Sequence, residues 1–300
     1  MSENGFSSTV IKADDPGSAE VRRIVLDYIK RYPEMAQQLE LYGAVMEIQQ
    51  DALSGLSCDV EIDDPDMESL VLLGEPLVRA SDMMIDAAEL RSVLERICEV
   101  VAEKSPEPTP PCGDFAGWAG LEQENLVDTL EKVVSGTGLD LTGSWAGAED
   151  LAARLIWESM VPFIRVCGAA LEERINQPAW QRGYCPVCGS RPLIGKFRED
   201  DGLWLLECSL CHSLWNIQRV GCSFCCDGAQ GTLEYLYLDD DRSRRVQYCG
   251  ACRTYVKTVD LREGEHGVLL PLENIVTYRL DQAASEEGLK PPDSLSHRPV

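Results

Sequence analysis

The stretch Tyr184-Cys-Pro-Val-Cys-Gly-Ser190 opens the part of the chain that decides its fold, because it holds the first of four C-x-x-C pairs. The two thiolates of such a pair lie on one tight turn, and two such turns supply the four sulfur ligands of a tetrahedral metal site. The four pairs therefore predict two complete four-cysteine sites. They are Cys185/Cys188, Cys208/Cys211, Cys222/Cys225 and Cys249/Cys252.

The residues between the pairs indicate which turns share a site. Residues 191–197 and 203–207 predict two short strands around a turn at 200–202, and residues 232–238 and 244–248 predict a second hairpin. A hairpin brings its two ends together, so its flanking pairs form one site. We assign Cys185, Cys188, Cys208 and Cys211 to the first site and Cys222, Cys225, Cys249 and Cys252 to the second. An interleaved pairing of the turns is the alternative.

Other roles for these cysteines fit the pattern less well. A disulfide framework needs an oxidising compartment, and a thioredoxin-like redox pair needs a β-α-β context. Four repeated, hairpin-linked pairs favour metal instead. Zinc and iron both accept four thiolates, so the spacing leaves the metal open.

Several segments of the C-terminal half resemble the formate dehydrogenase accessory protein family, FdhE. They are residues 184–190, 206–215, 219–225, 233–236 and 255–260, and residues 272–284 are similar to the family's final helix. The N-terminal half resembles the family only in outline, as an all-helical segment. Cys226 departs from the pattern, because a small residue usually follows the third pair there. This extra thiol is a packing residue, a spare ligand or a redox partner.

The resemblance implies a function. It implies an accessory or maturation protein, a chaperone and not an enzyme, that binds the catalytic subunit of a formate dehydrogenase and is needed for that subunit's assembly or activity. That client is a molybdenum- or tungsten-containing enzyme. The resemblance and the rubredoxin-like plan favour iron in both sites, with zinc as the other candidate. A rubredoxin-like carrier of one electron is the alternative function.

Length, charge and composition further limit the classes of protein to which this chain can belong. The 300 residues suffice for a sizeable core, and the start of the chain lacks a secretory signal pattern. No apolar run is long enough to span a membrane, so we expect a cytoplasmic protein whose thiols stay reduced. The net charge is −24, and residues 1–179 carry 34 acidic and 13 basic side chains. Such a surface repels phosphate backbones and disfavours a zinc-ribbon nucleic-acid binder.

The first half predicts helices at about 21–31, 33–53, 121–134 and 148–175, the last kinked at Pro162. A further helix is expected to begin near Ser81 as its N-cap, with Cys98 packed on its apolar stripe. The proline-rich stretch 105–112 predicts a surface linker that leaves Cys112 exposed. Residues 272–287 predict a last helix that stops at Gly288, followed by a frayed tail. Cys58 and Cys167 are expected to be packing residues.

Together these features predict an α + small β fold. An N-terminal all-helical domain (1–178) precedes two tandem rubredoxin-like or zinc-ribbon-like modules (179–217 and 218–265) and a C-terminal helix with a tail (266–300). We find no catalytic motif, and His212 beside a ligand cysteine is expected to be a supporting donor or exposed. Trp204, Trp215 and Phe224 are expected in the cores of the ribbons. Arg182, His212, Arg219 and Arg253 flank the cysteine turns and are candidate docking or clamping residues.

Overall fold

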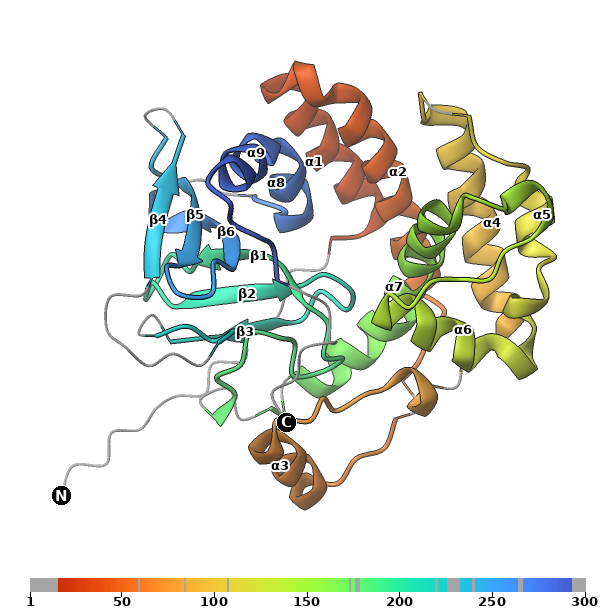
Figure 1. Ribbon diagram of the computed structural model, residues 1–300, viewed down its shortest axis with the longest axis horizontal. Helices are drawn as coiled ribbons and strands as arrows, with labels where there is room; N and C mark the ends of the chain where they lie inside the picture. The colour runs from red at the N-terminus through yellow and green to blue at the C-terminus, as the bar shows by residue number, and fades with distance from the viewer. Residues whose placement is uncertain are drawn as a thin grey trace.

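The computed structural model describes residues 16–58, 60–83, 85–106, 108–172, 174–175, 179–218, 221–225, 233–238, 241–263 and 267–292. A body of helices lies beside a sheet, and two further helices lie between the sheet and the first helical pair (Figure 1). The predicted fold class, helices followed by a small sheet region and C-terminal helices, is confirmed. No helix within the described ranges is both long enough and apolar enough to cross a membrane.

Seven helices described in the first half form the helical body. They are α1 (Ser18–Arg31), α2 (Ala36–Leu53), α3 (Asp64–Leu73), α4 (Ala87–Lys104), α5 (Cys112–Ala116), α6 (Gln123–Ser135) and α7 (Glu149–Glu172). Short 3-10 turns lie at Pro33–Met35, Ala80–Asp82, Ala119–Leu121 and Gly143–Trp145. Pro162 lies inside α7, which continues for ten residues beyond it. The kink expected there stays a prediction.

The start predicted for α4 is wrong. Ser81 lies in a separate 3-10 turn, and α4 begins at Ala87. Its N-cap is Asp86, whose carboxylate accepts hydrogen bonds of 2.9 Å from the backbone of Ala88 and of Glu89. A carboxylate that accepts two of the free N–H groups of a first turn is a stronger cap than a serine upstream, because its charge also complements the helix dipole.

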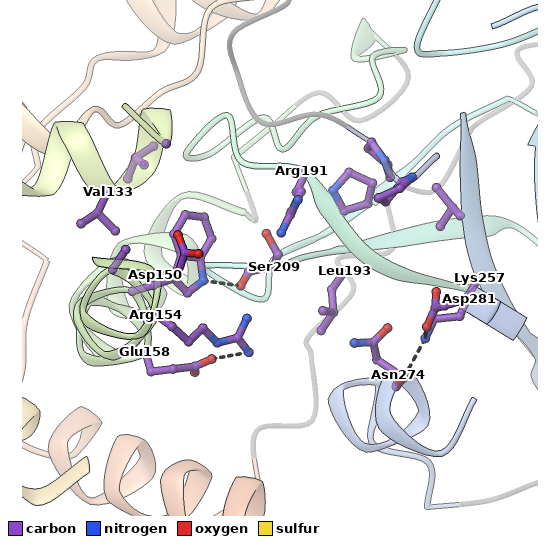
Figure 2. Close-up of a pocket in the computed structure, with 18 of the residues that line it drawn as sticks. Val133, Asp150, Arg154, Glu158, Arg191, Leu193, Ser209, Lys257, Asn274 and Asp281 are labelled. Atoms are coloured by element: carbon purple, nitrogen blue, oxygen red, sulfur yellow. Dashed lines mark hydrogen bonds and ion pairs between the residues drawn. The ribbon is translucent and has the colours of Figure 1, made fainter. Parts of the chain in front are cut away.

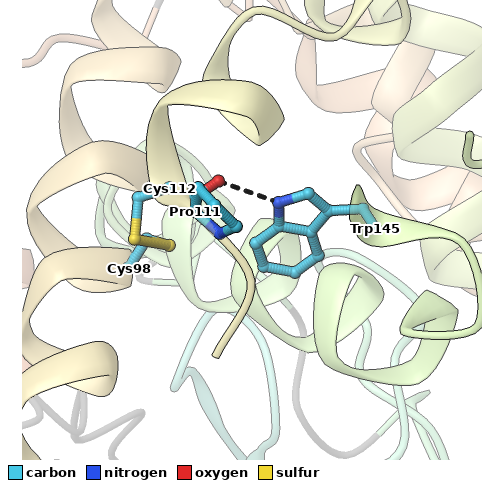
Figure 3. Close-up of a disulfide and its surroundings, with 4 residues drawn as sticks. All are labelled: Cys98, Pro111, Cys112 and Trp145. Carbon is cyan, nitrogen blue, oxygen red and sulfur yellow. Dashed lines mark hydrogen bonds between the residues drawn. A yellow bond between two sulfur atoms is a disulfide. The ribbon is translucent and has the colours of Figure 1, made fainter. Parts of the chain in front are cut away.

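Cys98 packs in the main core as expected, whereas Cys112 is half-buried rather than exposed, because the two residues form a disulfide (Figure 3). Cys98 lies on α4, and Cys112 begins α5 at the end of the proline-rich stretch. The indole of Trp145 donates a hydrogen bond of 3.0 Å to the carbonyl of Pro111 and fixes the stretch from its other side. This segment is therefore anchored to the helical body at its end rather than lying free on the surface. Cys58 is half-buried and Cys167 is buried, and neither forms a disulfide.

Six strands form one sheet in the order β3-β2-β1-β6-β5-β4. The first ribbon supplies β1 (Pro192–Phe197), β2 (Trp204–Cys208) and β3 (Leu214–Asn216). The second supplies β4 (Leu233–Tyr237), β5 (Arg244–Cys249) and β6 (Tyr255–Asp260). The two predicted hairpins are present, whereas β3 and β6 were not predicted as strands. The ribbons join through a parallel pairing in which Gly195 lies opposite Thr258.

The C-terminal segment forms two helices rather than the one predicted. They are α8 (Leu270–Val276) and α9 (Tyr278–Glu286), separated at Thr277. The Thr277 hydroxyl donates to the carbonyl of Glu273 at 2.6 Å, a local bond that competes with a continuous helix. Gly288 follows α9 with φ of 69°, a left-handed conformation that glycine adopts without strain and that ends the helix near the predicted place.

One apolar core runs from the helical body into the first ribbon. It includes Leu94 and Ile97 of α4, Leu155 of α7, and Trp180 and Trp215 of the ribbon segment. A second cluster joins α1 and α2 to Leu272 of α8. The first ribbon is therefore packed as part of the main body. The division of the chain at residues 178, 217 and 265 stays a prediction.

Candidate metal centres

The first group of thiols lies at the end of β2 nearest the helical body. Its four sulfur atoms lie within 4.8 Å of one another. Sγ of Cys185 is 3.5 Å from Sγ of Cys211, and Sγ of Cys188 is 3.4 Å from Sγ of Cys208. The hairpin β1–β2 thus brings its two flanking turns together, as the sequence predicts, and the interleaved alternative is wrong.

The second group repeats this arrangement across the hairpin β4–β5. Sγ of Cys222 is 3.8 Å from Sγ of Cys252, and Sγ of Cys225 is 3.8 Å from Sγ of Cys249. Four ligands at about 2.3 Å from a central zinc ion in a tetrahedron lie about 3.8 Å apart. The spacing in both groups is close to this value, so each is able to hold one metal ion.

The backbone of the turns supports the charged form of the ligands. The N–H groups of Leu210 and Cys211 point at Sγ of Cys208 at 3.3 Å and 3.4 Å. In the second group Cys252 N–H points at Sγ of Cys249 at 3.5 Å. Such dipoles stabilise a thiolate because they place partial positive charge beside it. The chemistry of these turns therefore suits metal-bound sulfur.

Three turns close with a residue in the left-handed region directly after the second cysteine. These residues are Gly189, His212 and Arg253, with φ of 72°, 56° and 63°. The corresponding residue of the fourth turn is Cys226, which lies outside the described residues. Glycine adopts this conformation without strain, whereas a residue with a Cβ atom, such as His212 or Arg253, is strained there.

The two groups differ in burial. All four cysteines of the first group are buried, whereas Cys225 of the second is exposed and Cys252 is half-buried. The helical body encloses the first group: Leu77 and Val78 donate backbone hydrogen bonds of 3.0 Å and 2.8 Å to Pro186 and Val187. The side chain of Trp157 on α7 donates to the Ser209 carbonyl at 3.1 Å.

Burial also affects the protonation of the first group. It raises the pKa of the Cys185 and Cys208 thiols well above the usual value, because a charge loses its hydration there. A bound cation reverses this preference by offering its charge directly to the sulfur atoms. Binding of an ion there would therefore be coupled to the loss of these protons.

The predicted neighbours of the cysteines have structural partners. The indole of Trp215 donates to the Arg182 carbonyl at 3.1 Å, and that of Trp204 donates to the Thr258 hydroxyl at 3.2 Å. Both side chains are buried, as expected, and Phe224 packs against the main core. His212 is buried rather than exposed, and its Nδ1 lies 2.7 Å from a carboxylate oxygen of Glu207.

The candidate docking arginines are largely engaged within the chain. Arg182 lies against Gly74 at the end of α3 and over the ring of Trp180, at 5.9 Å. Arg253 donates to the carbonyl of Glu287 and lies over the ring of Tyr248. These contacts fit a clamping role. Arg219 lies outside the described residues, and so do His266 and His297.

The sequence did not predict a cavity that lies between the sheet and the helices. Arg191 and Ser209, next to cysteines of the first group, line a cavity together with α7. Arg191 was visible in the sequence as the third residue after Cys188. Its proximity to α7 was not, because nothing in the local sequence indicates which helix packs there.

The fold and these two clusters define the class: an α + small β protein with two four-cysteine groups on one sheet. A family model described as "FdhE, central domain" matches residues 184–219. A protein named FdhE homolog from Aquifex aeolicus is 24% identical over 267 residues, covering 86% of this chain and 87% of that protein. Protein FdhE of Escherichia coli O1:K1 / APEC is 36% identical over 195 residues, covering 63% and 60%.

A solved structure shows the same fold. It is the crystal structure of the FdhE protein from Pseudomonas aeruginosa, with a TM-score of 0.62 and 21% identity, covering 92% of this chain and 93% of that one. The family model, the FdhE homologues and the FdhE crystal structure together support the FdhE family for this chain.

Proposed function

We propose that this chain is an accessory protein that binds the catalytic subunit of a formate dehydrogenase and supports that subunit's assembly or activity. The similarity to FdhE proteins suggests the client, and the observation that carries the proposal is the pair of four-cysteine groups. Four thiolates fill a tetrahedral shell and leave no position for a water nucleophile, so a metal held there is not built for hydrolysis. Such centres fit a structural role, in which the bound metal stabilises the fold of a surface that binds a partner.

The proposed ligands are Cys185, Cys188, Cys208 and Cys211 for one ion and Cys222, Cys225, Cys249 and Cys252 for the other. Iron is the proposed metal, and zinc is the competing one, because the borderline-soft ligand set accepts both. The proposed compartment is the cytoplasm. A net charge of −24 supports a protein partner rather than a nucleic acid.

Co-purification tests this function. An affinity-tagged form of the full chain, expressed without oxygen in cells that make the formate dehydrogenase, is expected to retain the catalytic subunit. The enzyme activity of cells that lack the chain is expected to fall, and to return with the wild-type gene. A tagged protein that is folded and metal-loaded but retains no catalytic subunit, even after cross-linking in cells, contradicts the proposal.

A second function, the carrier of one electron, is favoured by the exposure of Cys225. An electron leaves a buried iron centre most readily where a ligand reaches the surface, and the second group has such a ligand. Visible spectra of anaerobically prepared protein distinguish the two functions. Reversible bleaching of an iron tetrathiolate spectrum by a reductant supports the carrier, whereas protein that binds only zinc and still retains the client excludes it.

A further inference from the structure

A cavity of about 530 Å³ lies where the helical body meets the sheet (Figure 2). One wall is α7, with Asp150, Arg154 and Glu158, and the opposite wall is the start of β1, with Arg191 (Figure 2). Lys257 of β6 lies at the far end. The volume of the cavity is in the range of pockets that bind ligands, and none of the eight clustered cysteines lines it.

Two of the cations around the cavity are neutralised. Arg154 lies 2.7 Å from a carboxylate oxygen of Glu158, one helical turn away on α7. The ammonium of Lys257 lies 2.6 Å from Asp281 and donates to the Asn274 carbonyl at 2.7 Å. Each of these two cations is neutralised by its own carboxylate, so neither attracts a charged ligand strongly.

Three polar groups in the lining are left without partners among the described residues. They are the guanidinium of Arg191, the carboxylate of Asp150 and the hydroxyl of Ser209. The Ser209 hydroxyl is buried, and a buried hydroxyl without a hydrogen bond costs free energy unless a ligand supplies one. Arg191 and Ser209 are neighbours, since the Ser209 N–H donates to the Arg191 carbonyl at 3.0 Å.

The arrangement of these groups indicates the chemistry of the ligand. A guanidinium next to a hydroxyl suits a carboxylate, because both donate hydrogen bonds to its oxygens. Asp150 on the opposite wall suits a cation. Trp157 and Val134 add apolar surface between them. An extended peptide supplies all three features, because its side chains carry charges of both signs several ångströms apart.

We propose that this cavity binds an extended segment of the partner polypeptide, which presents a carboxylate to Arg191 and Ser209 and a cationic side chain to Asp150. Only the identity of that partner, the formate dehydrogenase catalytic subunit, rests on the proposed function. The binding chemistry rests on the cavity itself.

The cavity is also connected to the first group of thiols. Ser209 directly follows Cys208, and the Trp157 indole holds the Ser209 carbonyl at 3.1 Å. A segment bound in the cavity therefore contacts the turn that presents two of the sulfur atoms. This contact makes Trp157 a reporter that lies in the cavity and touches the turn.

A peptide titration tests the binding chemistry without the client. The probes are acetyl-Lys-Leu-Glu-amide and its glutamine counterpart, and the readout is the fluorine resonance of Trp157 in protein labelled with 5-fluorotryptophan. The Trp157→Phe variant assigns that resonance. We expect the glutamate peptide to shift it saturably and to bind about tenfold or more tightly than the glutamine peptide. Arg191→Gln is expected to remove this difference, whereas the distant Arg23→Gln is expected to keep it.

The same titration can overturn the proposal. No shift of the Trp157 resonance at millimolar peptide contradicts it, and so does equal binding of the two peptides by the wild-type protein. Because Arg191 is exposed, the Arg191→Gln variant is expected to fold, and the shared resonances of the other tryptophans check this.

A photo-crosslinking experiment tests the identity of the partner. A photoreactive residue at Val134, in the cavity lining, is compared with one at Val127, which is exposed on the same helix outside it. We expect the catalytic subunit to cross-link at Val134 only, and Arg191→Glu to reduce the yield by about tenfold. Co-purification without this difference overturns the cavity proposal and leaves the proposed function intact. Peptide binding without co-purification supports the cavity and contradicts the proposed function.

Discussion

The hydroxyl of Tyr28 on α1 donates a 2.6 Å hydrogen bond to the carboxylate of Glu273 on α8, 245 residues later. The other oxygen of Glu273 accepts from Arg244 of β5 at 2.7 Å. Glu273 is fully buried, so this carboxylate joins the first helix, the sheet and the C-terminal helices without contact with water. Burial and the bond to the carboxylate both raise the pKa of Tyr28.

Removal of this carboxylate is expected to destabilise the whole chain. Glu273→Ala removes the partner of the Tyr28 hydroxyl and the closest carboxylate of Arg244, which keeps a 3.4 Å contact with Asp241. We expect this loss to lower the free energy of unfolding by about 3–5 kcal/mol. Urea unfolding followed by circular dichroism measures the change. The matched control is Glu20→Ala, which removes an exposed ion pair with Arg23 and is expected to cost under about 1 kcal/mol. Equal changes in the free energy of unfolding for the two substitutions would contradict this stabilising role of Glu273.

The two thiol groups are expected to release metal at different rates. The first is enclosed by the helical body, whereas the second has an exposed ligand, Cys225. A chelator such as EDTA is therefore expected to remove one equivalent at least about tenfold faster than the other. Cys225→Ser should abolish the fast phase, and Cys188→Ser should abolish the slow one. Single-phase release of two equivalents from wild-type protein contradicts this assignment.

The left-handed conformation of Arg253 predicts an unusual order of stability. Alanine and glycine at this position both lose the side-chain contacts, but glycine has no Cβ to strain at φ of 63°. We expect Arg253→Gly to be more stable than Arg253→Ala by about 1 kcal/mol. At Arg23, an exposed residue in the interior of α1, the order is expected to be the reverse by a similar amount. Thermal unfolding of the four variants measures both differences, and the same order at both positions refutes the argument.

Asp260 predicts a pH dependence of stability. Burial opposes its charge, but hydrogen bonds from Arg262 and Arg245 outweigh this effect and lower the pKa of Asp260 below its usual value. A lowered folded pKa gives a stabilisation that is present above the unfolded value of about 4 and is lost as the pH falls through the folded pKa. Asp260→Asn is expected to cost about 3 kcal/mol at pH 7. The difference from wild type should shrink below pH 4, and a constant difference down to pH 2 would contradict the cause.

The Cys98–Cys112 disulfide predicts sensitivity to reductants. The two cysteines are 14 residues apart, and closing such a loop stabilises a fold by about 3 kcal/mol. Dithiothreitol is expected to lower the wild-type melting temperature, whereas Cys112→Ser is expected to be less stable and indifferent to the reductant. Cys58→Ser, at a free thiol, serves as the control. If mass spectrometry of the isolated protein finds both thiols free, this bond does not form in the reducing compartment expected for the chain.

The cysteine clusters were predictable because their geometry is local. A C-x-x-C turn and a hairpin specify the positions of four thiols within about thirty residues, and little else is needed. The start of α4 was misplaced because Ser81 and Asp86 are both good caps, and the choice between them depends on packing. The disulfide was missed because a helix and a proline-rich stretch carry no sequence signal that they meet. The cavity depends on how α7 packs on the sheet, and no short segment encodes that.

Small metal-binding ribbons fold with their ion, so loss of an ion from such a ribbon is ordinarily expected to unfold that ribbon alone. The structure favours a different outcome for the first ribbon, because Trp180 and Trp215 belong to the same core as α4 and α7. Loss of the first metal ion is thus expected to loosen the helical body as well. The second ribbon packs against α9 in a separate cluster, so loss of its ion is expected to affect the helical body less.

The parallel pairing of β1 with β6 has a consequence for synthesis on the ribosome. Gly195 cannot meet Thr258 until more than sixty further residues have been made, so the inner edge of the first hairpin waits for the last strand. During that interval the edge has unsatisfied backbone groups, to which another nascent chain can add. Early capture of an ion by the first four thiols would hold this hairpin in place while the rest of the sheet is translated.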